Sequence, residues 1–165
     1  AGVLDMNVVY SSDKMKSAEE SSSTITAYDF AIGIPIGKTN MYAAFSYGAF
    51  NSATATDTTT TWGSTDMGLK FGGFFGKGKM YSASLTYNLK STVKYADGTN
   101  NTELRGTSLK LGFGVNFWLR ESVALALRLF YYSPTLGEEV DQTTLTKVSY
   151  GRTYMGPAIG LTWEF

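Results

Sequence analysis

Eight charged side chains are the residues most able to carry chemistry, because each stands on the polar side of a segment in which polar and apolar residues alternate. Carboxylates and cations in such positions suit either acid–base catalysis or a network of ion pairs. The set comprises Asp5, Asp29, Asp66, Lys70, Lys90, Lys110, Arg128 and Arg152.

The sequence offers little support for catalysis. It contains no histidine and no cysteine, which removes the commonest general base, the commonest transition-metal ligand and every thiol nucleophile. A serine–lysine or paired-carboxylate site needs neither residue type, but no motif marks one. We therefore predict no catalytic residue, no cofactor, no metal site and no enzymatic activity. The 14 basic and 14 acidic side chains balance, so no nucleic-acid partner is expected.

The segments that hold these charges alternate with a period of two residues, which is typical of β-strands. One face of each segment is free of charges, amides and aliphatic hydroxyls. These apolar faces fall within residues 4–10, 28–36, 41–49, 67–75, 81–89, 109–117, 123–131 and 155–165. About ten residues at a rise of ~3.3 Å and a tilt of ~45° cover roughly 23 Å, close to the ~25 Å apolar band of a membrane barrel.

The two faces differ in a way that favours a membrane barrel over a soluble one. The polar face is rich in glycine, alanine and serine, which suits a narrow lumen, and the apolar face is aromatic and never interrupted by charge. A Lys or Arg in mid-membrane costs about 2–4 kcal/mol, which explains such purity on a face that meets lipid. We predict an all-β, eight-stranded antiparallel up-and-down transmembrane β-barrel that forms a single domain over residues 1–165.

The connections alternate between short and long. Residues 37–40, 76–79 and 119–122 form short turns, whereas residues 11–23, 51–61 and 133–146 are long and polar, and 96–102 is of medium length. Short turns are periplasmic in outer-membrane barrels, so both termini are expected there. Closure requires the first strand to pair with the last, and Pro157, which lacks an amide hydrogen, predicts a bulge or a local loss of pairing.

Aromatic residues near the strand ends predict two interfacial girdles. We expect Tyr10, Tyr28, Tyr47, Tyr95 and Tyr131 towards the long connections, and Phe75, Tyr81, Phe117, Trp163 and Phe165 towards the short turns.

The last seven residues, Ile-Gly-Leu-Thr-Trp-Glu-Phe, carry a resemblance to a known class. The pattern of Leu161, Trp163 and a C-terminal Phe165 resembles the final strand of Gram-negative outer-membrane barrels, above all the small group that includes the OmpA membrane domain and OmpX. This resemblance implies a bacterial outer-membrane location, contact with its lipids, and recognition of the final strand by the barrel-assembly machinery. Since the chain ends at Phe165, an OmpA-type periplasmic domain is not expected.

Function follows from the expected lumen. Eight strands leave an interior just wide enough for side chains, and mixed charges there predict a salt-bridge network and no open channel. We therefore expect a monomeric barrel with a structural or surface-interaction role, with any partner bound by residues 11–23, 51–61 and 133–146. The alternative is a narrow or gated conduit, or a binding cavity, for small solutes or apolar ligands.

Overall fold

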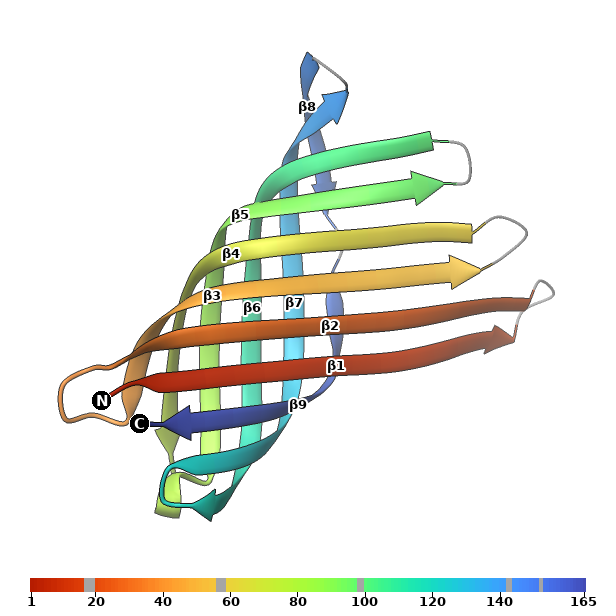
Figure 1. Cartoon of the computed structure of the whole chain (residues 1–165). Coiled ribbons are helices and arrows are strands. Elements are labelled where there is room, and N and C mark those ends of the chain that lie inside the picture. The colour runs from red at the N-terminus through yellow and green to blue at the C-terminus, as the bar shows by residue number, and fades with distance from the viewer. Residues whose placement is uncertain (17–19, 56–58, 98–99, 142–143, 152) are drawn as a thin grey trace.

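The computed structural model consists almost entirely of β-strands (Figure 1). It describes the backbone of residues 1–16, 20–55, 59–97, 100–141, 144–151 and 153–165, and the side chains of residues 1–9, 25–51, 61–96, 101–140 and 153–165. The elements are β1 (Val3–Lys16), β2 (Glu20–Pro35), β3 (Met41–Ala55), β4 (Thr59–Phe75), the 3-10 turn η1 (Lys77–Lys79), β5 (Tyr81–Asp97), β6 (Asn100–Arg120), β7 (Val123–Asp141), β8 (Thr144–Gly151) and β9 (Tyr154–Glu164).

The strands form a closed antiparallel ring. Each strand from β1 to β7 pairs with its neighbour in the sequence, and β9 pairs with both β7 and β1. The upper part of β7 pairs instead with β8, so β8 and β9 together occupy the eighth position in the ring. The predicted eight-stranded antiparallel barrel is confirmed, with its last strand divided in two. Within the described residues, no helical segment has the length and apolar composition needed to cross a membrane.

The barrel is apolar outside and polar inside. Large hydrophobic side chains such as Ile34, Leu89 and Ile159 are each at least 64% exposed on the outer face. On the inner face, Asp5 and Asp66 are 0% exposed and Lys70 is 1% exposed. A soluble protein exposes such charges and buries such hydrophobic residues, so this distribution is the one expected of a barrel that is surrounded by lipid.

The strands are longer than the sequence pattern predicts. The regions expected as loops, the long connections 11–23, 51–61 and 133–146 and the medium-length connection 96–102, are mostly strand wherever the backbone is described. The expectation of loops there was therefore wrong. Above the apolar band the outer face of a strand meets water while the inner face packs apolar side chains such as Val93 and Leu136, so the outward apolar alternation stops while backbone pairing continues.

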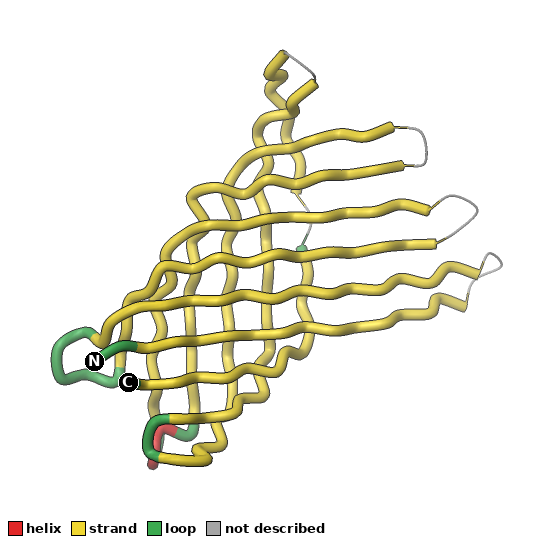
Figure 2. Tube along the Cα trace, in the orientation of Figure 1, coloured by secondary structure: helices red, strands yellow, loops and turns green. Residues whose placement is uncertain are grey.

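The short turns and the two termini lie at the same end of the barrel (Figure 2). Gly2 and Phe165 exchange backbone hydrogen bonds, and the amide of Glu164 donates to the carbonyl of Ser122 in the turn between β6 and β7. In the turn between β2 and β3, Gly37 has a φ of 61°, a conformation that glycine adopts without strain. The opposite end carries the hairpins between β1 and β2, β3 and β4, β5 and β6, and β7 and β8.

Candidate functional site in the barrel lumen

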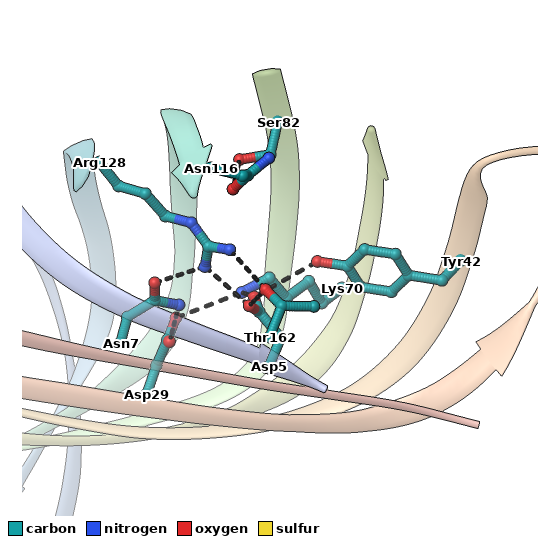
Figure 3. A network of polar contacts seen from close by, with 9 residues as sticks. All are labelled: Asp5, Asn7, Asp29, Tyr42, Lys70, Ser82, Asn116, Arg128 and Thr162. Carbon is teal, nitrogen blue, oxygen red and sulfur yellow. Dashed lines mark hydrogen bonds and ion pairs between the residues drawn. The ribbon is translucent and has the colours of Figure 1, made fainter. Parts of the chain in front are cut away.

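Asp5 is the centre of a buried polar cluster that crosses the lumen (Figure 3). Its carboxylate lies 2.6 Å from Lys70 Nζ and 2.8 Å from Arg128 Nη1, and it accepts a hydrogen bond of 2.8 Å from the Thr162 hydroxyl. The Tyr42 hydroxyl donates to the same carboxylate at 3.3 Å. These partners come from β4, β7, β9 and β3, so one carboxylate on β1 ties together strands on several sides of the barrel.

Asn7 and Asp29 extend this Asp5 cluster along β1 and β2. The Asn7 side chain accepts a hydrogen bond from Arg128 Nη1 and donates one to Asp29. Lys70 Nζ lies 3.8 Å from Asp29, so the lysine bridges two carboxylates. Asn7 was not among the eight candidate residues because it is uncharged, although its place on the polar face of the first strand is the signal that could have identified it.

A second polar cluster surrounds Asp66 on β4. The Asp66 carboxylate lies 3.5 Å from Lys110 Nζ and accepts hydrogen bonds from the hydroxyls of Ser108 at 3.1 Å and Tyr132 at 3.3 Å. Lys110 Nζ also lies 5.4 Å from the centre of the Tyr132 ring, within the range of a cation–π contact. Asn88 and Ser91 donate to Ser108 from the neighbouring strand, so this Asp66 cluster joins β4, β5, β6 and β7.

Glycines make room for the long charged side chains. A Cβ atom at Gly48 would collide with Lys110 Nζ, and one at Gly160 would collide with Asn7 and with the Arg128 guanidinium. These glycines on the polar face therefore have a spatial reason: the neighbouring strand lacks a side chain where Lys110 or Arg128 lies across it.

Aromatic side chains close the lumen on both sides of the charges. Towards the termini, the Phe74 ring lies 5.8 Å from that of Tyr42 and 5.7 Å from that of Trp118. Towards the hairpins, Phe50 stacks on Tyr132 at 5.3 Å within a larger apolar cluster. The void between this apolar cluster and the charges has a volume of about 10 Å³, room for about one water molecule.

Lys79 and Glu164 form an ion pair that the sequence did not reveal. Lys79 Nζ lies 2.7 Å from the Glu164 carboxylate and 5.3 Å from the centre of the Trp118 ring. The pair joins η1 to the last strand, so it fastens the turn end of the barrel. No sequence signal could have indicated it, because Lys79 belongs to a turn.

The structure brings six of the eight candidate charges into the two lumen clusters. The prediction that Lys90 belongs with them was wrong, because its side chain is exposed on the outside. The register of β5 shifts by one residue: Asn88 pairs with Gly68 and Lys90 with Met67, which leaves Leu89 unpaired in a bulge. Leu89 and Lys90 are consequently both exposed, and the alternation resumes with Ser91 inside. Arg152 lies outside the described residues.

The same bulge corrects the placement of Tyr95. We expected this residue in the outer girdle, but it packs against the interior apolar cluster and its ring lies 6.4 Å from that of Trp62. The other girdle residues with described side chains lie on the outer face; they are Tyr28, Tyr47, Tyr131, Phe75, Tyr81, Phe117, Trp163 and Phe165. The side chain of Tyr10 lies outside the described residues.

The lumen clusters have the character of a structural core. Their carboxylates, cations and hydroxyls are directed at one another across the barrel, and the charged members are at most 7% exposed. Within the described ranges, no group of three Asp or Glu side chains comes together in a way that could hold a metal ion. A substrate would have to break ion pairs to reach any of these groups, so the arrangement is suited to holding strands together.

No protein-family model matches the sequence, and no curated protein is detectably similar to it. Among solved structures, the chain is similar to Neisserial surface protein A (NspA), with a TM-score of 0.60 and 14% identity over 99% of this chain and 97% of that one. The chain has the fold of an eight-stranded outer-membrane β-barrel. At this identity the likeness concerns the fold alone.

Two autotransporter domains are more distant. The translocator domain of NalP from Neisseria meningitidis has a TM-score of 0.48 at 10% identity, over 99% of this chain and 88% of that one. The beta domain of the Bordetella autotransporter BrkA has a TM-score of 0.31 at 10% identity and full coverage of both chains. Neither likeness is close enough to carry an argument. The narrower resemblance to OmpA and OmpX stays a prediction.

Proposed function

We propose that this chain is an integral protein of a bacterial outer membrane, with a lumen that does not conduct and a structural or surface-interaction role. The observation that carries the proposal is the pair of buried ion clusters. Lys70 Nζ and Arg128 Nη1 each lie within 2.8 Å of the Asp5 carboxylate, and Lys110 Nζ lies 3.5 Å from the Asp66 carboxylate. Solutes moving along the axis would have to separate these charges from their partners.

The outer surface supports the membrane part of the proposal. Its band of exposed hydrophobic residues runs around the barrel, from Val8 on β1 to Ile159 on β9. Outer-membrane lipids are the partners that this band suits. The final strand, with Leu161, Trp163 and Phe165 on its outer side, has the form of a signal for the barrel-assembly machinery, and we propose that it serves as one during insertion.

The proposed surface role belongs to the strand extensions and hairpins. The residues of 11–23, 51–61 and 133–146 whose backbone is described lie at the end opposite the termini, and the sequence of these ranges is mostly polar. With both termini periplasmic, this end would project from the cell, where a partner could bind it. We propose a monomer that performs no catalysis. The alternative, a narrow or gated conduit, requires the ion clusters to open.

Reconstitution into lipid tests the two parts of this proposal separately. The purified barrel should insert into phospholipid vesicles and should migrate differently on SDS gels before and after boiling, because a closed ring of paired strands resists SDS. In planar bilayers, it should give no steady conductance steps above those of bilayers alone. Failure to insert would contradict the membrane location, and reproducible steps would establish the conduit in place of the closed lumen.

A further inference from the structure

The seam between β1 and β9 closes over only part of its length. Residues 3–8 of β1 pair with residues 159–164 of β9, although β1 continues to Lys16 and β9 begins at Tyr154. If the register continued, Val9 would pair with Ala158 and Tyr10 with Pro157, and neither pair forms. Beyond Val8 the two strands diverge (Figure 1).

Pro157 explains where the pairing stops. Phe165 and Gly2 exchange backbone hydrogen bonds across the seam, whereas the Glu164 amide donates towards the other neighbour at Ser122. Successive residues of a strand direct their N–H groups to opposite sides, so every second residue counted back from Phe165 faces β1. Pro157 is one of these residues and has no N–H to donate. The ladder therefore ends at the pair formed by Val8 and Ile159.

A groove opens on the outer face at this point. It is lined by Val8, Leu127, Arg128, Leu129, Pro157, Ala158 and Ile159. Arg128 is the one charged residue in the lining, and its guanidinium is already held inside the barrel by Asp5, Asn7 and Thr162. Leu127 is 59% exposed and Ile159 is 64% exposed. The groove has a volume of about 670 Å³, within the range of small-molecule binding sites.

The groove has an apolar lining, and towards the hairpin end of the barrel it is continued by backbone hydrogen-bonding groups. Behind the seam, Val9 and Ala158 belong to the interior apolar cluster with Phe130. Above it, the seam-facing backbone groups of Tyr10 and Ser12 have no strand partner in the described backbone. The pair formed by Leu129 and Pro157 lies two residues before the pair formed by Tyr131 and Met155, so the groove lies just inside the aromatic girdle on the hairpin side. Lipid headgroups would lie at that girdle.

We propose that this seam groove binds one acyl chain of a lipid, with the headgroup at the unpaired strand edge. The inference rests on the proposed membrane location, which places the groove against hydrocarbon. A β-strand from a second copy is the other possible occupant of an open edge. Pro157 argues against a strand added along β9, because a proline interrupts any ladder there, and the lining of the groove, apolar apart from Arg128, suits an acyl chain.

Native mass spectrometry of the detergent-solubilised barrel, titrated with palmitate, tests the proposal. The wild-type chain should bind one equivalent saturably. Pro157→Val, which restores the missing donor, and Leu129→Trp, which fills the groove, should each weaken binding about tenfold or more. Leu85→Trp is the matched control, because Leu85 is a comparably exposed leucine on β5, outside the groove lining, and should leave binding unchanged.

Three results would overturn the proposal: no saturable binding to the wild-type chain, equal weakening by Leu85→Trp and Leu129→Trp, or a dimer that palmitate does not dissociate. The heat-dependent gel shift confirms folding of each variant, and the two groove variants act by different means, so one suffices if the other does not fold. A barrel that inserts into vesicles but binds no palmitate would refute the groove alone. A barrel that does not insert would refute the membrane location.

Discussion

Single residues in the lumen show how this barrel tolerates buried charge. An unpaired buried charge would cost far more than a barrel of this size could sustain, and the cost falls only when partners are held in place. Asp5 has four such partners on four other strands, and Lys70 contacts two carboxylates. The charges therefore act as cross-links between strands that do not pair directly.

Lys70 and Lys90 allow a matched test of this role. Lys70→Met should lower the free energy of unfolding by roughly 3–5 kcal/mol, because it leaves Asp5 and Asp29 buried with one cation fewer. Lys90→Met should change it by less than about 0.5 kcal/mol, because that side chain is exposed. Urea unfolding in lipid vesicles, followed by tryptophan fluorescence, measures both. Similar losses for the two variants would show that Lys90 also belongs to a buried network.

Among the elements, the strands were predictable and their irregularities were not. Alternation identified the outer face of the apolar, lipid-facing part of the strands because that side admits no charge, as the purity of residues 109–117 illustrates. It could not reveal the bulge in β5, because Leu89 and Lys90 continue the apolar–polar alternation in the sequence while both side chains are exposed. The partners of Asp5 were also beyond reach, since they depend on how far neighbouring strands are staggered around the ring.

The bulge in β5 can be tested by removing its residues. Because Leu89 and Lys90 are both exposed between the buried Asn88 and Ser91, deleting Leu89 alone should give a regular strand with unchanged faces, whereas deleting both should turn Val93 and Tyr95 outward and Lys94 inward. We expect the double deletion to lower the free energy of unfolding by several kcal/mol and to change the near-ultraviolet circular dichroism spectrum. The deletion of Leu89 alone is the control and should retain the wild-type spectrum. A double-deletion variant that is as stable as the single deletion would mean that the bulge does not set the faces of the upper strand.

At the scale of the whole molecule, the two ends of the barrel are different surfaces. The turn end is compact and holds both termini, with Lys79 and Glu164 paired beside Trp118. The hairpin end carries extended strands whose polar residues need water. An outer-membrane barrel inserted with its short turns in the periplasm would present the hairpin end to the outside of the cell.

The absence of cysteine makes this orientation directly measurable, because an introduced thiol would be the only one in the chain. Glu138→Cys places it on an exposed position of the β7 extension, and Lys38→Cys places it in the exposed turn between β2 and β3. A maleimide that cannot cross membranes should label Glu138→Cys on intact cells and should label Lys38→Cys only after the outer membrane is opened. The reverse pattern would mean that the termini face outward, and the hairpin end could then serve no surface partner. Labelling of both positions on intact cells would mean that the barrel is not embedded as its apolar band requires.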